Sequence, residues 1–123
     1  MTTRGIRGAT TIDSDSKDNV LSAVHELLGA ILAANPDLKP VDIASALFTT
    51  TEDISSAFPA FAARQMGWTQ VPMISAREIP VPKSLPLCIR VLILWNTDIK
   101  QNSIQHIYLR DAANLRPDFG PHT

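Results

Sequence analysis

The chain has little of what several large classes of protein require. Its 123 residues include a single cysteine, Cys88, which cannot form an internal disulfide, so a reducing, cytoplasmic location is expected. No apolar segment follows the first basic residues, and a secretory signal is therefore not expected. The longest apolar run, 85–95, contains Pro86 and Arg90 and is shorter than the about 20 residues of a membrane-spanning helix. We expect a soluble protein that has no membrane partner.

Charge of one sign is also lacking, as are the signatures of metal and cofactor sites. Eleven basic against twelve acidic side chains give a formal charge of −1, so no nucleic acid is expected as a partner. The three histidines have no metal-ligand spacing, and the acidic cluster at 13–18 lacks the glycine and final glutamate of a calcium loop. Neither glycine-rich phosphate-binding motif occurs. Ser75 has no recognisable His and Asp companions, which argues against nucleophilic catalysis.

What the sequence does contain is typical of a globular protein, with 45% hydrophobic and 19% charged residues in a length that suits one domain, 1–123. Apolar residues at helical spacing predict a helix over 17–34, with Asp15 or Ser16 as its N-cap. A second helix is predicted over 54–66, because Pro59 lies near its start and a glycine follows its end.

Five segments have the composition of strands, namely 4–12, 41–51, 70–78, 86–97 and 105–111. The resulting order, β-α-β-α-β-β-β, predicts an α+β fold in which the helices cover one face of a mixed sheet. The last residues, 116–123, contain two prolines and a glycine and are expected to form a flexible tail.

Arg90 is the unusual residue of this pattern, because apolar neighbours on both sides suggest a strand buried on both faces. An isolated buried charge is very costly, so the guanidinium needs a partner. One candidate is a structural ion pair with Glu78 from the neighbouring predicted strand. The other is an anionic ligand, since a guanidinium matches two carboxylate oxygens. The spacing alone leaves these two interpretations equal.

Arg7 and Tyr108 are the other candidates for a binding site. Arg7 precedes Gly8, where the missing side chain lets a backbone or a ligand come close. Alone it is typical of a solvated edge residue, but together with Arg90 it makes a pocket for a dicarboxylate more plausible. Tyr108 alternates with apolar residues, as a half-buried tyrosine with its hydroxyl at the rim does.

The segments that carry these residues resemble one known family. RGIRGATT, CIRV and LRPD, in this order and spacing and together with FPAFAAR, GWTQVP and HIYL, are similar to the trimeric, non-helical class of chorismate mutases. The resemblance implies a homotrimer whose sheets form a pseudo-α/β-barrel, with active sites between subunits. It also implies the conversion of chorismate to prephenate in phenylalanine and tyrosine biosynthesis. This intramolecular Claisen-type [3,3] rearrangement needs no cofactor and no metal.

The resemblance further implies a role for each site residue. Arg7 binds a substrate carboxylate, Arg90 sits at the ether oxygen, and Tyr108 contacts the side-chain carboxylate. Glu78 and Ser75 hold the ring hydroxyl. The remaining expected substrate-binding residues are Ile74, Ala76 and Arg77, and Phe58, Arg64 and Leu115 from the adjacent subunit.

One departure from the family pattern and two alternative functions bear on this interpretation. Some relatives carry a lysine where this chain has Phe61, so a weaker positive charge is expected at the pocket mouth. A non-catalytic trimer that binds a small carboxylate metabolite is the main alternative, but capture of a carboxylate needs only cations and does not explain Glu78. A deaminase of reactive imines would also use a strand arginine at an interface, but the GIRGATT and LRPD segments do not support it.

Overall fold

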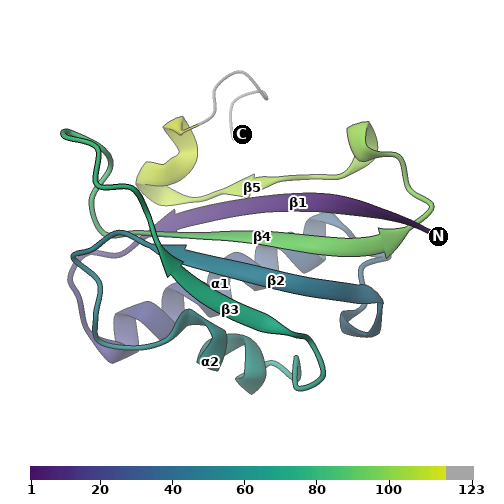
Figure 1. Ribbon diagram of the computed structural model, residues 1–123, viewed down its shortest axis with the longest axis horizontal. Coiled ribbons are helices and arrows are strands. Elements are labelled where there is room, and N and C mark those ends of the chain that lie inside the picture. Colours follow the sequence, from purple (N-terminus) through teal and green to yellow (C-terminus); the bar gives the residue numbers. More distant parts are fainter. Residues whose placement is uncertain (116–123) are drawn as a thin grey trace.

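A five-stranded sheet with two α-helices packed on one of its faces makes up the computed structural model, which describes residues 1–115 (Figure 1). The expected tail, 116–123, lies outside the described residues. The elements in chain order are β1 (Thr2–Thr11), α1 (Lys17–Ala34), β2 (Ile43–Thr50), α2 (Pro59–Gln65), β3 (Met73–Arg77), β4 (Cys88–Thr97) and β5 (Ile107–Tyr108). The predicted order of strands and helices is confirmed, as is a mixed sheet with both helices on one side.

The sheet is built around β4, which pairs antiparallel with β1 on one side and β2 on the other. The strand order is β3-β2-β4-β1-β5, and the two outer pairs, β2 with β3 and β1 with β5, are parallel. This order places β1 and β4 side by side although most of the chain separates them. Arg7 and Arg90 thereby come to neighbouring strands.

Helix α1 packs along the sheet through one apolar stripe. Ser16 is its N-cap, and the Ser16 hydroxyl accepts a hydrogen bond of 3.1 Å from the Asn19 amide. Gly8 of β1 lies beneath the helix, where a Cβ would come within 2.8 Å of Ile31 Cδ1. The missing side chain of Gly8 therefore lets α1 approach the strand closely.

Two predicted elements are much shorter in the structure. The predicted helix over 54–66 is wrong for its first residues, because α2 begins only at Pro59. The segment before it is held in an irregular path, where Asp15 accepts hydrogen bonds from the Ser55 and Ser56 amides. The predicted strand over 105–111 is reduced to Ile107–Tyr108, because the backbone turns at Arg110, whose φ is 53°, into a 3-10 helix, η3 (Arg110–Asn114).

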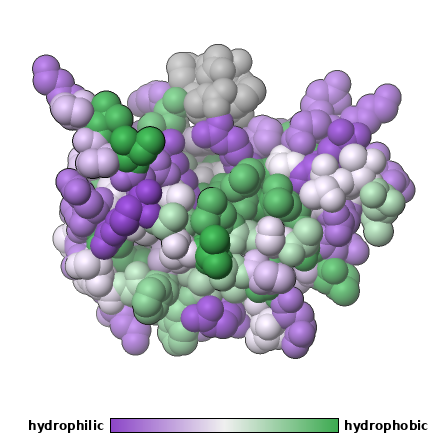
Figure 2. All heavy atoms as spheres, in the orientation of Figure 1, coloured by the Kyte–Doolittle hydropathy of each residue, from purple (hydrophilic) through white to green (hydrophobic). Residues whose placement is uncertain are grey.

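The expectation that β4 is buried on both faces is wrong for the single chain. Its residues alternate, with Val91, Ile93 and Trp95 buried against the helices. On the other face Arg90 is half-buried and Leu92 is 39% exposed, because neither α-helix of the described residues covers that face. Figure 2 shows apolar atoms gathered over the middle of this helix-free face, with polar residues around them. Such a patch on a sheet is typical of a surface that binds a partner.

Candidate active site

Four of the sequence-predicted residues line one cavity of about 250 Å³ on the helix-free side of the sheet. Arg7, Arg90 and Tyr108 come from β1, β4 and β5, and Glu78 directly follows β3. The register aligns Arg90 with Ala9 of β1, and Ala9 with Tyr108. The cavity is lined by Arg7, Gly8, Leu47, Thr49, Glu78, Arg90, Val91, Leu92 and Tyr108.

Arg90 and Glu78 face each other in this cavity. Arg90 Nε lies 3.7 Å from Glu78 Oε2, and the two side chains are 31% and 27% exposed. Thr49 of β2, next to Arg90 in the sheet, donates its hydroxyl hydrogen to the same Glu78 oxygen. The ion pair considered from the sequence is therefore present, but at a length beyond a hydrogen bond. Arg90 Nε is buried and has no hydrogen-bond acceptor among the described residues, so it is available to an oxygen of a ligand.

Arg7 is positioned through its backbone as well as its side chain. Its amide donates a hydrogen bond of 3.0 Å to His106 Nδ1. Its guanidinium carbon lies 5.9 Å from the centroid of the Tyr108 ring, which is within range of a cation–π contact. Burial lowers the pKa of His106, which favours the neutral ring that can accept this bond. Sequence reasoning missed Thr49 and His106; for His106, its place directly before the Ile-Tyr pair of β5 was the available signal.

Five other predicted residues line a second, larger cavity of about 540 Å³ beside α2. This group consists of Phe58, Arg64, Ser75, Ala76 and Arg77. Ser75 and Glu78, which were expected to hold one hydroxyl together, are thus in different cavities of the chain. Arg77 donates from Nη1 to Thr50 Oγ1 and to the Thr51 and Ile54 carbonyl oxygens, so much of its capacity holds the loop before α2.

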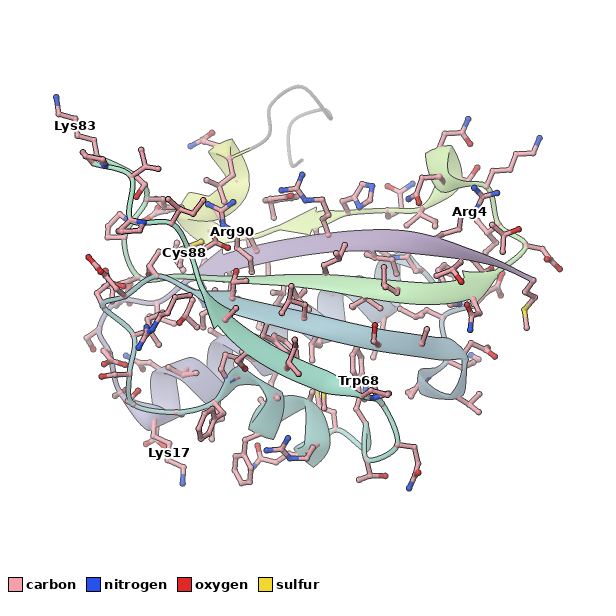
Figure 3. The ribbon with its side chains drawn as sticks, viewed as in Figure 1. Arg4, Lys17, Trp68, Lys83, Cys88 and Arg90 are labelled. Carbon is pink, nitrogen blue, oxygen red and sulfur yellow. The ribbon has the colours of Figure 1, made fainter. Side chains whose placement is uncertain are left out.

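The last two predicted residues line neither cavity. Ile74 of β3 is 70% exposed. Leu115 packs on a small buried cluster formed by Ala9, Cys88, Tyr108 and Ala112, next to the smaller cavity of its own chain. In Figure 3, Arg90 and Cys88 lie together near the start of β4, whereas Lys17, which lines the larger cavity, is well below them. One chain therefore presents the predicted site as separate parts.

The chemistry open to these cavities is that of cations, a carboxylate and hydroxyls. No group of His, Cys, Asp and Glu in residues 1–115 has the arrangement of a metal site. Burial raises the pKa of the Cys88 thiol, which makes it a poor nucleophile. Among the helices described, none has the length and apolar character needed to cross a membrane. The arrangement is suited to binding a carboxylate-bearing molecule and to stabilising negative charge that develops on one of its oxygens.

Comparison with known proteins agrees with this chemistry. Residues 3–119 match the family model described as chorismate mutase type I. The chain is 54% identical to a chorismate mutase of Thermus thermophilus, with 94% of each chain covered. It is 40% identical to a chorismate mutase of Bacillus subtilis, over 96% of this chain and 93% of that one. A solved chorismate mutase structure from Clostridium thermocellum superimposes with a TM-score of 0.85 at 44% identity, over 88% of this chain and 96% of that one.

Proposed function

Since the chain belongs to the chorismate mutase type I family and is itself a chorismate mutase, an isomerase of aromatic amino acid biosynthesis, we propose that it rearranges chorismate in the cavity between Arg7, Glu78, Arg90 and Tyr108. The single observation that carries this assignment is the buried Arg90 Nε, which has no acceptor among residues 1–115. A donor that lacks a partner costs free energy until an oxygen reaches it, so the site is prepared for an anionic ligand.

Arg90 acts on the bond that breaks. In the rearrangement the C–O bond weakens ahead of C–C formation, and negative charge collects on the ether oxygen. A guanidinium already held in a partly dry cavity stabilises this charge more than it stabilises the ground state. One such donor contributes about 3–4 kcal/mol. Because even modest enzymes lower the barrier by about 8 kcal/mol, the remainder has to come from other groups.

Restriction of the flexible substrate supplies that remainder. Arg7 and Tyr108 lie at one side of the cavity and bind the two carboxylates of chorismate, while Glu78 accepts a hydrogen bond from its ring hydroxyl. Thr49 fixes the Glu78 carboxylate by donating to it. Holding the substrate in its compact, reactive conformation removes much of the entropic part of the barrier. No proton has to move and no covalent intermediate has to form.

The complete site, in this proposal, forms between subunits of a homotrimer. Support comes from the separation of the two cavities within one chain and from the apolar residues on the helix-free face, including Leu92. Phe58 is 71% exposed beside the larger cavity, and an aromatic side chain so exposed is typical of an interface. Packing the helix-free faces inward as a pseudo-barrel would join the larger cavity of one subunit to the smaller cavity of the next. The free thiol of Cys88 is consistent with a cytoplasmic trimer.

The test is the loss of chorismate absorbance in the ultraviolet with purified protein. The wild type should consume chorismate, whereas Arg90→Lys should turn over at least about 100-fold more slowly, because lysine keeps the charge but loses the planar fork. Arg110→Lys is a matched control, since Arg110 is exposed and paired with Glu26 on the surface. Wild-type turnover in Arg90→Lys would contradict the role of Arg90. Binding of chorismate without its consumption would favour the alternative of a non-catalytic carboxylate binder.

A further inference from the structure

The larger cavity holds two cations over one aromatic ring. Lys17 Nζ lies 5.5 Å from the centroid of the Phe61 ring, and Arg64 Cζ lies 5.9 Å from the same centroid. Lys17 comes from the first residue of α1 and Arg64 from the last turn of α2. All three side chains line the larger cavity, so α1 and α2 each place one positive charge at its opening, which we call the mouth.

These charges are not neutralised within the described part of the chain. No acidic residue of 1–115 lines the larger cavity, and neither Lys17 nor Arg64 forms a salt bridge there. The carboxylate of Asp15 accepts hydrogen bonds from Ser55 and Ser56 and keeps its negative charge, but it does not line the cavity and forms no salt bridge with Lys17 or Arg64 in the described part of the chain. The charged side chains that line the cavity among the described residues are therefore all cations, namely Lys17, Arg64 and Arg77.

Lys17 also occupies a position that helix stability disfavours. The N-terminus of a helix carries a partial positive charge, so a cation in the first turn is unfavourable. The lysine is exposed and extends away from α1, as Figure 3 shows. A position that the helix does not favour, combined with a ring that orients the ammonium group, points to a ligand as the reason for the charge.

We infer that Lys17 is a substrate-binding residue of this mutase, which acts with Arg64 to attract a carboxylate of the dianionic substrate at the mouth of the site. The inference rests on the proposed function and on the joining of the two cavities between subunits. It modifies the expectation of a weaker positive charge at the pocket mouth. Phe61 is uncharged, but its ring contacts the ammonium group of Lys17, which α1 places there.

The experiment compares Lys17→Gln with the wild type in chorismate turnover at low and high ionic strength. Two positive charges near the path of a dianion raise kcat/KM mainly through association, and salt screens this effect. At about 10 mM salt, where the screening length is about 30 Å, Lys17→Gln should lower kcat/KM roughly 3- to 10-fold through KM. At about 1 M salt, where that length is about 3 Å, the difference should vanish. Lys17→Arg, which keeps the positive charge, should have the kcat/KM of the wild type at both salt concentrations.

Lys100→Gln is the matched control, because it removes one exposed positive charge beyond the far end of β4, away from both cavities. It should leave kcat/KM unchanged at both salt concentrations. The thermal midpoint of Lys17→Gln should equal or slightly exceed that of the wild type, since the helix start loses a cation. Equal kcat/KM and equal salt dependence in Lys17→Gln and the wild type would overturn the inference, as would a loss confined to kcat. The proposed function would still stand if the wild type consumed chorismate and Arg90→Lys did not.

Discussion

Charge in the smaller cavity is only partly balanced before substrate binds. Arg7 and Arg90 bring two positive charges against one negative charge from Glu78. Chorismate brings two carboxylates, so its arrival leaves one negative charge unmatched in this cavity. In the proposed trimer the cations of the larger cavity, Lys17 and Arg64, would match it from a neighbouring subunit. In that trimer each half of the site is thus electrostatically incomplete, and the substrate and the neighbouring subunit would complete it together.

His106 is expected to make the stability of the folded protein depend on pH. Burial holds its pKa below the ordinary value of 6.5, so between that value and the folded pKa the unfolded chain binds more protons than the folded chain. Stability from the neutral ring is present above pH 6.5 and is lost as the pH falls through the folded pKa. We expect the urea midpoint of the wild type to drop between pH 7 and pH 5. His106→Asn, which keeps an acceptor for the Arg7 amide but does not titrate, should show a smaller drop. An identical drop in both proteins would contradict this role.

At the scale of single elements, Gly8 sets the distance between α1 and the sheet. An alanine Cβ at this position would meet Ile31 Cδ1 at 2.8 Å, Val91 Cγ1 at 3.2 Å and Leu27 Cδ1 at 3.3 Å. Overpacking of this kind costs about 1–3 kcal/mol, and Gly8→Ala should lower the free energy of unfolding by that amount in urea denaturation.

Gly29, which lies within α1 itself, provides the opposite case. None of the described residues comes within 4 Å of a Cβ built at Gly29, and alanine is the better helix former. Gly29→Ala should therefore raise the free energy of unfolding by about 0.5–1 kcal/mol. If both substitutions shifted stability in the same direction, close packing at Gly8 would not be the explanation.

Local patterns predicted the elements better than their ends. The apolar spacing of 17–34 was sufficient for α1, because its buried face repeats with the helical period. The start of α2 could not be read in the same way, since the path of 54–58 is fixed by distant partners, Asp15 and Arg77. Likewise β5 ends early because the chain turns at Arg110, which pairs with Glu26 on α1. Contacts of this range leave no periodic signal in the sequence.

The same reasoning applies to the site. Arg90 was visible as a charge within an apolar run, and the motifs around it identified Arg7, Glu78 and Tyr108. His106 and Lys17 were missed, because each acts through a neighbour that only the fold supplies. The anomaly that first marked Arg90, a strand with two apolar faces, holds for the single chain on one face only. The second apolar face is what the proposed trimer would cover.

At the scale of the whole molecule, a shared site can be tested by mixing subunits. Arg90→Ala and Arg64→Ala should each be nearly inactive alone, because every site would lack one arginine. When the two variants are unfolded together in equal amounts and refolded, random assembly gives a fraction of sites with both arginines intact. Activity should recover to about one-quarter of the wild-type value if each site takes Arg90 from one subunit and Arg64 from its neighbour. Refolding each variant separately before mixing is the control. No recovery after joint refolding would show that each subunit contains its own complete site.

The pairing of β1 with β4 has a consequence for how the protein is made. Thr2 pairs with Thr97 and Ala9 with Arg90, so β1 emerges from the ribosome long before its partner strand exists. Until then β1 offers unpaired backbone groups, and its glycines, Gly5 and Gly8, weaken its tendency to associate with other chains. Contacts of such long sequence separation form slowly and late. Arg7 and Arg90, the two arginines of the proposed site, therefore come together only after β4 has paired with β1, so activity is expected only from chains whose sheet is complete.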